Sequence, residues 1–247
     1  MTRDDSWING EDVPPKAEGS RRRGTSRRGA SGPPTDTRWR KRKGVRRALN
    51  TLSVVLVLGG VGLLAFPFAT NMWADHRQGE LAEEFGREEL RTAYVRHDIK
   101  PGQALTRLTI PKLGVDTIVV EGTTPSALRA GSGHYENTAL PCEPGNAGIA
   151  GHRTTYSKPF ANIDKLRPGD QIILETPIGK CWYEVEKMPW TTGPFDWTIV
   201  KNVGGARLTM SACHPPGSAA QRLVVRSKLV RTQFRAEDGS FVDAVQS

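Results

Sequence analysis

The stretch that decides the fold is Arg207-Leu-Thr-Met-Ser-Ala-Cys213-His-Pro-Pro-Gly-Ser-Ala-Ala-Gln-Arg222-Leu-Val-Val-Arg226. Two runs rich in β-forming residues, 207–212 and 222–228, flank a segment that contains Pro and Gly, which predicts two antiparallel strands joined by a loop. If the loop closes symmetrically, Cys213 lies opposite Arg222, with β-carbons about 4.5 to 5.5 Å apart. Arg226, roughly 13 Å further along the strand, should pair near Thr209. Only Arg222 can then reach the sulfur.

A thiol beside a guanidinium suits nucleophilic catalysis. The thiolate is the reactive form of a cysteine, and a neighbouring positive charge favours it. A guanidinium is charged at any working pH and can donate hydrogen bonds to a developing oxyanion. An acyl transfer at Cys213 therefore still needs a general acid and base.

Five histidines could supply that group: His76, His97, His134, His152 and His214. His76 and His97 precede the β-rich region. His214 follows Cys213 directly, so its side chain should point to the opposite face of the strand. His134 lies in a Gly-rich turn, where it could be near the site or simply pack its ring. His152 ends the small, apolar strand 147–151 and opens a loop, a position where side chains face a cleft. His152 is therefore the preferred candidate.

Charge is concentrated at the start of the chain. Residues 1–47 hold 14 Lys and Arg against 6 Asp and Glu, a net charge of 14 − 6 = +8 out of +9 for the whole chain. They are rich in Arg, Gly, Pro and Ser and cannot bury a core, which predicts a disordered basic tail. A nucleic-acid arm is the alternative. It is disfavoured because only Trp7 and Trp39 could stack on bases and no recognition fold accompanies them.

An uncharged, largely apolar run follows. No charged residue occurs from Ala48 to Ala74, which predicts a transmembrane helix at 48–70. A cluster of Lys and Arg stands just before it, and the positive-inside rule keeps that flank in the cytoplasm. The remaining chain would then lie outside the cell membrane as a single-pass protein. A cleaved signal peptide and a buried core helix are weaker alternatives, because no clear Ala-x-Ala site follows Phe68 and the run is long.

The rest of the chain divides into three parts. A charged segment, 71–103, is expected to be a helical stalk, with Gly79 and Gly86 weakening its continuity. Residues 104–232 alternate short β-runs with turns, which predicts a mainly β, closed barrel with few short helices. The expected strands are 107–111, 115–120, 147–151, 171–176, 180–187, 207–212 and 222–230, and the expected helices are 125–130 and 159–166. Residues 233–247 are expected to be a flexible tail.

The three cysteines leave two possibilities open. Cys142 and Cys181 could form a disulfide outside the cell, leaving Cys213 free, or Cys142 could sit in a loop and Cys181 could be a small β residue. One adjacent Cys-His pair is not zinc-ligand spacing. No metal or other cofactor is expected.

Several motifs, taken together, resemble the sortase family, and most closely the class E sortases of actinobacteria. They are Ile149-Ala-Gly-His152-Arg, Lys158-Pro-Phe160, Asp164-Lys-Leu166, Pro168-Gly-Asp170, Thr209-Met-Ser-Ala-Cys213 and Gln221-Arg222-Leu-Val-Val225. The resemblance covers roughly residues 104–232 and includes the order of a membrane anchor followed by a barrel. It departs from the family pattern Thr-Leu-x-Thr-Cys at Met210 and Ala212. Ala212 removes a hydroxyl beside the nucleophile.

The resemblance implies a membrane-anchored transpeptidase with Cys213, His152 and Arg222 as its catalytic residues. Such an enzyme cuts a sorting motif, Leu-Pro-x-Thr-Gly or Leu-Ala-x-Thr-Gly, between Thr and Gly, through a Cys thioester. Its partners would be surface proteins that carry the sorting signal and an amine of a cell-wall peptide, the peptidoglycan acceptor. The lipid bilayer would hold the anchor, and no nucleic acid would take part.

Four further residues are candidates for substrate binding: Tyr156, Phe160, Trp197 and Ala212. The three aromatic residues could line a peptide cleft, although aromatic residues near strand ends more often complete a barrel core. Asp164 is expected to pair locally, and Arg153 and Arg226 to be structural.

Two other functions remain open. The chain could be a different exported cysteine enzyme, but a required arginine on the following strand does not belong to L,D-transpeptidases or amide hydrolases. It could also be a membrane-tethered β-barrel that binds peptides without catalysis, with Cys213 as a small buried residue. Indifference of peptide binding to thiol alkylation would favour that alternative.

Overall fold

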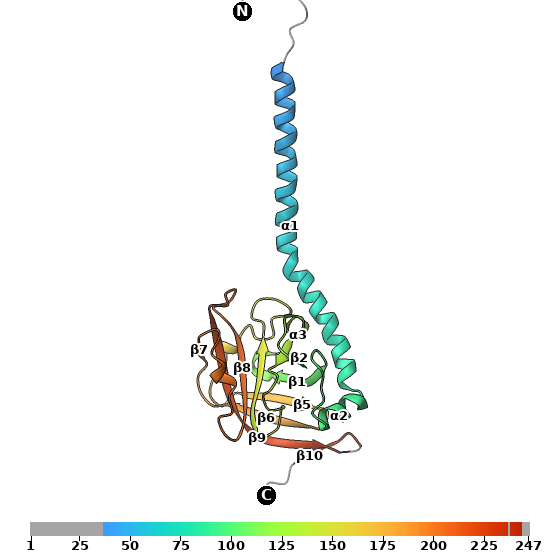
Figure 1. The fold of residues 1–247 in the computed structure, drawn as a ribbon, viewed down its shortest axis with the longest axis vertical. Coiled ribbons are helices and arrows are strands. Elements are labelled where there is room, and N and C mark those ends of the chain that lie inside the picture. Colours follow the sequence, from blue (N-terminus) through green and yellow to red (C-terminus); the bar gives the residue numbers. More distant parts are fainter. Residues whose placement is uncertain (1–36, 237, 244–247) are drawn as a thin grey trace, which may run out of the picture. The chain divides into compact units, whose positions relative to one another are not determined.

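The structure is a computed structural model, and it describes residues 37–236 and 238–243 of the 247-residue chain. Nine of its strands follow the order β10-β9-β6-β5-β1-β2-β3-β4-β8, β7 pairs with β9 beside this path, and β8 pairs back onto β9 to close a barrel (Figure 1). The strands are β1 Ala104–Ile110, β2 Val115–Glu121, β3 Ser132–His134, β4 Gly145–Gly151, β5 Gln171–Thr176, β6 Gly179–Val185, β7 Trp190–Thr192, β8 Ala206–His214, β9 Gln221–Arg235 and β10 Phe241–Asp243. The closed β-barrel predicted from the sequence is confirmed.

The described helices are fewer than the strands. They are α1 Thr37–Phe85, α2 Glu88–Val95 and α3 Pro125–Ala130, with 3₁₀ turns η1 Pro111–Leu113, η2 Ile163–Lys165 and η3 Trp197–Val200. The helix expected at 125–130 is confirmed, with Thr124 as its N-cap. The helix expected at 159–166 is wrong, because only the turn η2 forms there. Phe160, Ile163 and Leu166 are all buried, and their spacing of three suits a 3₁₀ turn better than an α-helix.

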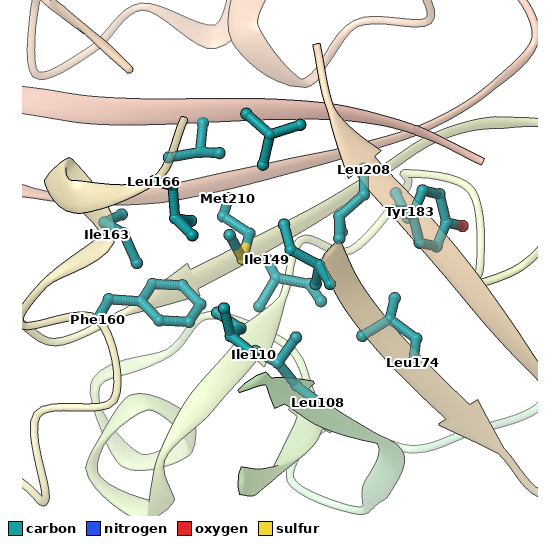
Figure 2. Packing of buried hydrophobic residues seen from close by; sticks show 14 of the residues in the cluster. Leu108, Ile110, Ile149, Phe160, Ile163, Leu166, Leu174, Tyr183, Leu208 and Met210 are labelled. Carbon is teal, nitrogen blue, oxygen red and sulfur yellow. The ribbon is translucent and has the colours of Figure 1, made fainter. Parts of the chain in front are cut away.

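The barrel interior is an apolar core. Burial alternates along β5 and β6, as expected for strands with one face inward. Figure 2 shows side chains from β1, β4, β5, β6 and β8 meeting in this core, closed at one side by Phe160, Ile163 and Leu166 from the segment after β4. The loop that follows His152 is therefore attached to the core at Phe160.

Burial does not alternate along β4, because six of its seven residues, Gly145 to Ala150, are buried. Ile149 faces the core, while the opposite face is also covered. A Cβ at Gly148 would lie 2.8 Å from the Tyr135 ring, and one at Gly151 would lie 2.6 Å from the Phe160 ring. These contacts explain why so glycine-rich a run forms a central strand. It must let aromatic rings approach its backbone on both sides.

The C-terminal part of α1 is packed on the barrel. Gln78 donates to the carbonyl oxygens of Ile118 and Ala130, at 3.0 and 2.7 Å, and accepts from the Ile118 amide at 2.6 Å. A second buried cluster joins this helix and α2 to the sheet. It comprises Leu81, Leu90, Ala104, Ile118, Val120, Ala127 and Ala130. The segment expected to be a stalk is helical, and the break between α1 and α2 lies at Gly86, whereas Gly79 is inside α1.

α1 also contains the apolar run. Among the described residues it is the one helix long and apolar enough to cross a membrane, and its apolar side chains, including Leu56, Leu63 and Phe68, are exposed. The helix begins at Thr37, so the end of the segment expected to be a disordered tail, 1–47, is helical. Residues 1–36 lie outside the described residues.

The C-terminal segment also differs from expectation. β9 runs to Arg235 and pairs with β10, so residues 233–243 include regular β-structure where a flexible tail was expected. Arg231 on β9 donates two hydrogen bonds to Asp243, at 3.0 and 2.8 Å, which fixes the register of this last hairpin.

Candidate active site

Cys213 and Arg222 lie directly opposite each other on β8 and β9. The Nη1 atom of Arg222 donates to the Cys213 sulfur at 3.4 Å. Cys213 is partly exposed and is the cysteine left unpaired, so the sulfur combines access to solvent with a neighbouring positive charge. The cross-strand pair predicted from the sequence is confirmed.

Arg226 takes the other role expected of it. It pairs with Thr209, donating to its hydroxyl at 3.2 Å, and also donates to the carbonyl of Ile199 at 2.7 Å. These bonds tie β9 to β8 and to η3. Arg226 therefore has a structural role beside the site. Arg222 is the arginine whose guanidinium lies next to the Cys213 sulfur and can contact a group bound there.

His152 reaches the same end of the barrel through a parallel strand pair. β4 runs parallel to β8, and the last pair in the register joins Gly151 to Ala212. His152 is the first residue after β4, and Cys213 is the residue after Ala212 within β8, so the register places the two residues at neighbouring positions. Parallel strands bring their carboxyl ends to one edge, which is how residues far apart in sequence meet here.

The His152 ring is half-buried under Tyr156. The two ring centroids are 5.3 Å apart with a tilt of 38°. Burial lowers the pKa of His152 below its usual value, because the charged imidazolium loses hydration. The backbone carbonyl of His152 accepts from the Phe160 amide at 3.0 Å, which closes the loop between them.

The other histidines have different surroundings. His76 and His97 are exposed and each lies near a glutamate. His134 is buried, with Nδ1 2.8 Å from Glu121 and Nε2 2.9 Å from Thr138, so it holds the end of β3 rather than lying free at the site. His214 faces away from the Cys213 side and contacts Arg153 at 3.0 Å.

Arg153 links the two segments that flank the site. Its guanidinium contacts His214, the residue after Cys213, and it also donates to the carbonyl of Ala161 and to Asp164 at 3.2 and 3.0 Å. Asp164 thus pairs with Arg153 rather than with His152. Both residues have the structural roles expected of them.

Two residues proposed for substrate binding do not face a cleft in the structure. Phe160 is fully buried in the barrel core, and Ala212 is 3% exposed in the same cluster. The reason is local. Phe160 fills the space that Gly151 leaves open, and Ala212 alternates with Cys213, so it points inward when Cys213 points outward.

The other two candidates are accessible. Tyr156 is partly exposed beside His152, and Trp197 is 61% exposed on η3. Trp197 packs edge-on against Tyr135, with ring centroids 6.2 Å apart, and the Tyr135 hydroxyl lies 2.8 Å from the Ser211 hydroxyl. Ser211 is two residues before Cys213 on the same face of β8. Sequence reasoning missed Tyr135 and Ser211, although the alternation from Cys213 already points to Ser211.

The remaining cysteines are joined. Cys142 and Cys181 form a disulfide with their Cα atoms 5.7 Å apart, which decides between the two possibilities left open by the sequence. In the described part of the chain, no group of three or more His, Cys, Asp or Glu side chains is arranged to hold a metal ion.

Comparisons with known proteins agree with this geometry. A family model described as a sortase domain matches residues 108–230, and the chain belongs to the sortase family. Sortase SrtE1 of Streptomyces coelicolor is 33% identical over 153 residues, which are 56% of this chain and 44% of that protein. The chain thus matches less than half the length of this relative.

Two solved structures extend the comparison. Sortase E of Streptomyces avermitilis is 34% identical, covers 57% of this chain and 96% of its own, and gives a TM-score of 0.52. Sortase E1 of Streptomyces coelicolor with a tripeptide in its active site is 33% identical over 57% of this chain and 96% of its own, with a TM-score of 0.53. The likeness to sortase E types supports the resemblance first seen in the motifs.

Proposed function

We propose that this chain is a membrane-anchored cysteine transpeptidase that cleaves a C-terminal sorting motif between Thr and Gly and transfers the protein to an amine of a cell-wall peptide. The motif is of the Leu-Pro-x-Thr-Gly or Leu-Ala-x-Thr-Gly type. The observation that carries the proposal is the Cys213–Arg222 contact at 3.4 Å, at the barrel edge where His152 also leaves the sheet. A small buried cysteine in a binding module has no need of this arrangement.

The first half-reaction forms a thioester. The Cys213 thiolate attacks the Thr carbonyl carbon, and the new oxyanion accepts a hydrogen bond from Arg222, which lies beside the sulfur. When the tetrahedral intermediate collapses, the bond between that carbon and the Gly nitrogen breaks. The His152 imidazolium gives its proton to the departing amine and becomes neutral.

The second half-reaction restores the enzyme. Neutral His152 takes a proton from the incoming amine as its nitrogen attacks the thioester carbon. The carbon–sulfur bond then breaks, which releases the product amide and regenerates the thiolate. Burial lowers the pKa of His152 and so favours the neutral imidazole that this step needs.

A mass measurement tests the chemistry. The full chain in detergent is incubated with Leu-Ala-x-Thr-Gly or Leu-Pro-x-Thr-Gly peptides, with and without an amine acceptor, beside Cys213→Ala. We expect an acyl adduct in the wild type, its absence in Cys213→Ala, and a ligated peptide when amine is added. If the chain binds the peptides but forms no adduct and cleaves neither motif, the result would support the non-catalytic binding module instead.

We also propose the orientation in the membrane. The basic flank before α1's apolar run would stay in the cytoplasm and the barrel would lie outside the cell membrane. Cys213 is the free thiol in the chain because Cys142 and Cys181 are bridged, so it can report the orientation. A membrane-impermeant maleimide should label intact cells at Cys213. Labelling only after the cells are lysed would overturn this orientation.

A further inference from the structure

The loop that follows His152 has an unusual backbone. Tyr156, Ser157 and Lys158 are consecutive non-glycine residues with φ of 53°, 57° and 40°. Side chains with a Cβ avoid this left-handed region, so three in a row persist only where other contacts hold them. The contacts that hold this loop therefore decide where Tyr156 lies.

Helix α1 supplies those contacts. The Ser157 amide donates to the side-chain oxygen of Asn71 at 2.8 Å, and the Ser157 hydroxyl donates to the Asp75 carboxylate. Trp73 packs edge-on against Tyr156, with centroids 6.4 Å apart and an interplanar angle of 77°. Asn71, Trp73 and Asp75 lie directly after the apolar run of the helix.

The barrel offers the loop less support on one side. A cavity of about 400 Å³ is lined by residues 157–159, 161 and 162 and by residues 113–117, where η1 leads into β2, and Asp75 and Gln78 of α1 complete its lining. α1 itself is fixed to the sheet by Gln78 and by the buried Leu81. The helix is thus a firm support that bridges this gap and reaches the loop.

We propose that Tyr156 is a positioning residue for His152, and that Asn71, Trp73 and Asp75 of the membrane-proximal helix hold Tyr156 in place. This inference rests on the proposed function, in which His152 is the general acid and base. The chain of contacts runs from α1 through Ser157 and Tyr156 to the imidazole. The anchor then does more than tether the barrel, because it completes the support of the active site.

Several charged or titratable groups surround this chain of contacts. Asp75 is on α1, Lys158 and Arg153 are in the loop segment, and Cys213 and Arg222 end the neighbouring strands. Two opposite effects on the pKa of His152 can be distinguished, one from charge and one from burial. Removing the Asp75 charge alone would lower the pKa of His152, whereas uncovering the imidazole by releasing Tyr156 would raise it.

The experiment measures the His152 imidazole and turnover in the same samples. The full chain in detergent is labelled at histidine, the His152 signal is assigned with His152→Gln, and its pKa is followed by NMR in Tyr156→Ala, Tyr156→Phe, Asp75→Asn and the double variant Asn71→Ala/Asp75→Ala. His76→Ala is the matched control, because His76 neighbours Asp75 but is exposed and contacts only Glu80 among the contacts described.

We expect the pKa of His152 to rise in Tyr156→Ala and in the double variant, with kcat falling about tenfold and KM changing less than about twofold, as for a displaced catalytic group. Tyr156→Phe keeps the ring beside the imidazole and should keep the wild-type pKa of His152, and His76→Ala should match the wild type in both this pKa and kcat. The proposal would be overturned if Tyr156→Ala left both the pKa of His152 and kcat unchanged. It would also be overturned if the double variant lowered the pKa of His152 to the value found in Asp75→Asn. The NMR titration needs no turnover, so failure of the transpeptidase proposal remains distinguishable.

Discussion

Arg222 faces Cys213 across the β8–β9 pair, and its guanidinium donates to the sulfur at 3.4 Å. The contact links two separate requirements of an acyl transfer. In the proposed reaction, the guanidinium that contacts the nucleophilic sulfur also stabilises the oxyanion that forms when the sulfur attacks. The predictions below begin with this pair.

Substitution of Arg222 should slow the chemical step. We expect Arg222→Ala to lower kcat by about 10²- to 10³-fold, the usual loss when one oxyanion donor is removed, and Arg222→Lys to recover only part of it because an ammonium lacks the planar fork. Arg231→Ala is the matched control, since Arg231 lies on the same strand and pairs with Asp243. Equal kcat values for Arg222→Ala and Arg231→Ala would argue against this role.

Restoring the family's threonine at position 212 should cost stability rather than improve catalysis. The Ala212 side chain is packed in the apolar core opposite Leu223. A hydroxyl placed there without a partner costs roughly 1 to 3 kcal/mol. We expect Ala212→Thr to lower the free energy of unfolding by that amount in urea titrations, with kcat/KM unchanged. A faster enzyme of normal stability would contradict this.

Loss of the disulfide should weaken the fold but spare the nucleophile. Cys142 and Cys181 are 39 residues apart in sequence, for which the loop-entropy relation gives about 4 kcal/mol. Replacing both cysteines by alanine should lower the free energy of unfolding by about that amount. Alkylation of Cys213 under native conditions should proceed at the wild-type rate. A large change in that rate would show that the disulfide also affects the surroundings of Cys213.

Tyr183 should make the fold sensitive to alkali. Burial raises its pKa to about 12, although a hydrogen bond from the Cys142 amide opposes the shift. The unfolded chain loses this proton near pH 10, and the folded chain keeps it to higher pH. Stability from Tyr183 is therefore complete below pH about 10 and is lost as the pH rises toward 12. We expect the free energy of unfolding to fall less between pH 9 and 11 in Tyr183→Phe, and an equal fall in both proteins would refute this.

Much of the site could be predicted from the sequence because it depends on strand pairing and side-chain alternation within a short stretch of chain. The hairpin that places Cys213 opposite Arg222 follows from two β-runs and one turn, and the alternation of side chains separates His214 from the sulfur. The pairing of Arg226 with Thr209 follows from the same register. Only the spacing of residues along two neighbouring strands was needed.

What could not be predicted depends on contacts between distant segments. Phe160 lies near His152 in sequence, yet it turns inward because Gly151 leaves room for its ring. Tyr135 joins the site through a hydroxyl contact with Ser211. The support of Tyr156 by Trp73 crosses from the helix to a loop, and no periodicity in either segment signals it.

The parallel pairing of β4 with β8 has a consequence for biogenesis. Antiparallel neighbours can form early from adjacent parts of a chain, whereas this pair joins segments that are separated by most of the barrel's second half. His152 and Cys213 therefore come together only when that long-range pairing is made. Under the proposed function, a chain that has not yet made this pairing carries the thiol without its histidine, so transpeptidation starts only with completion of the barrel.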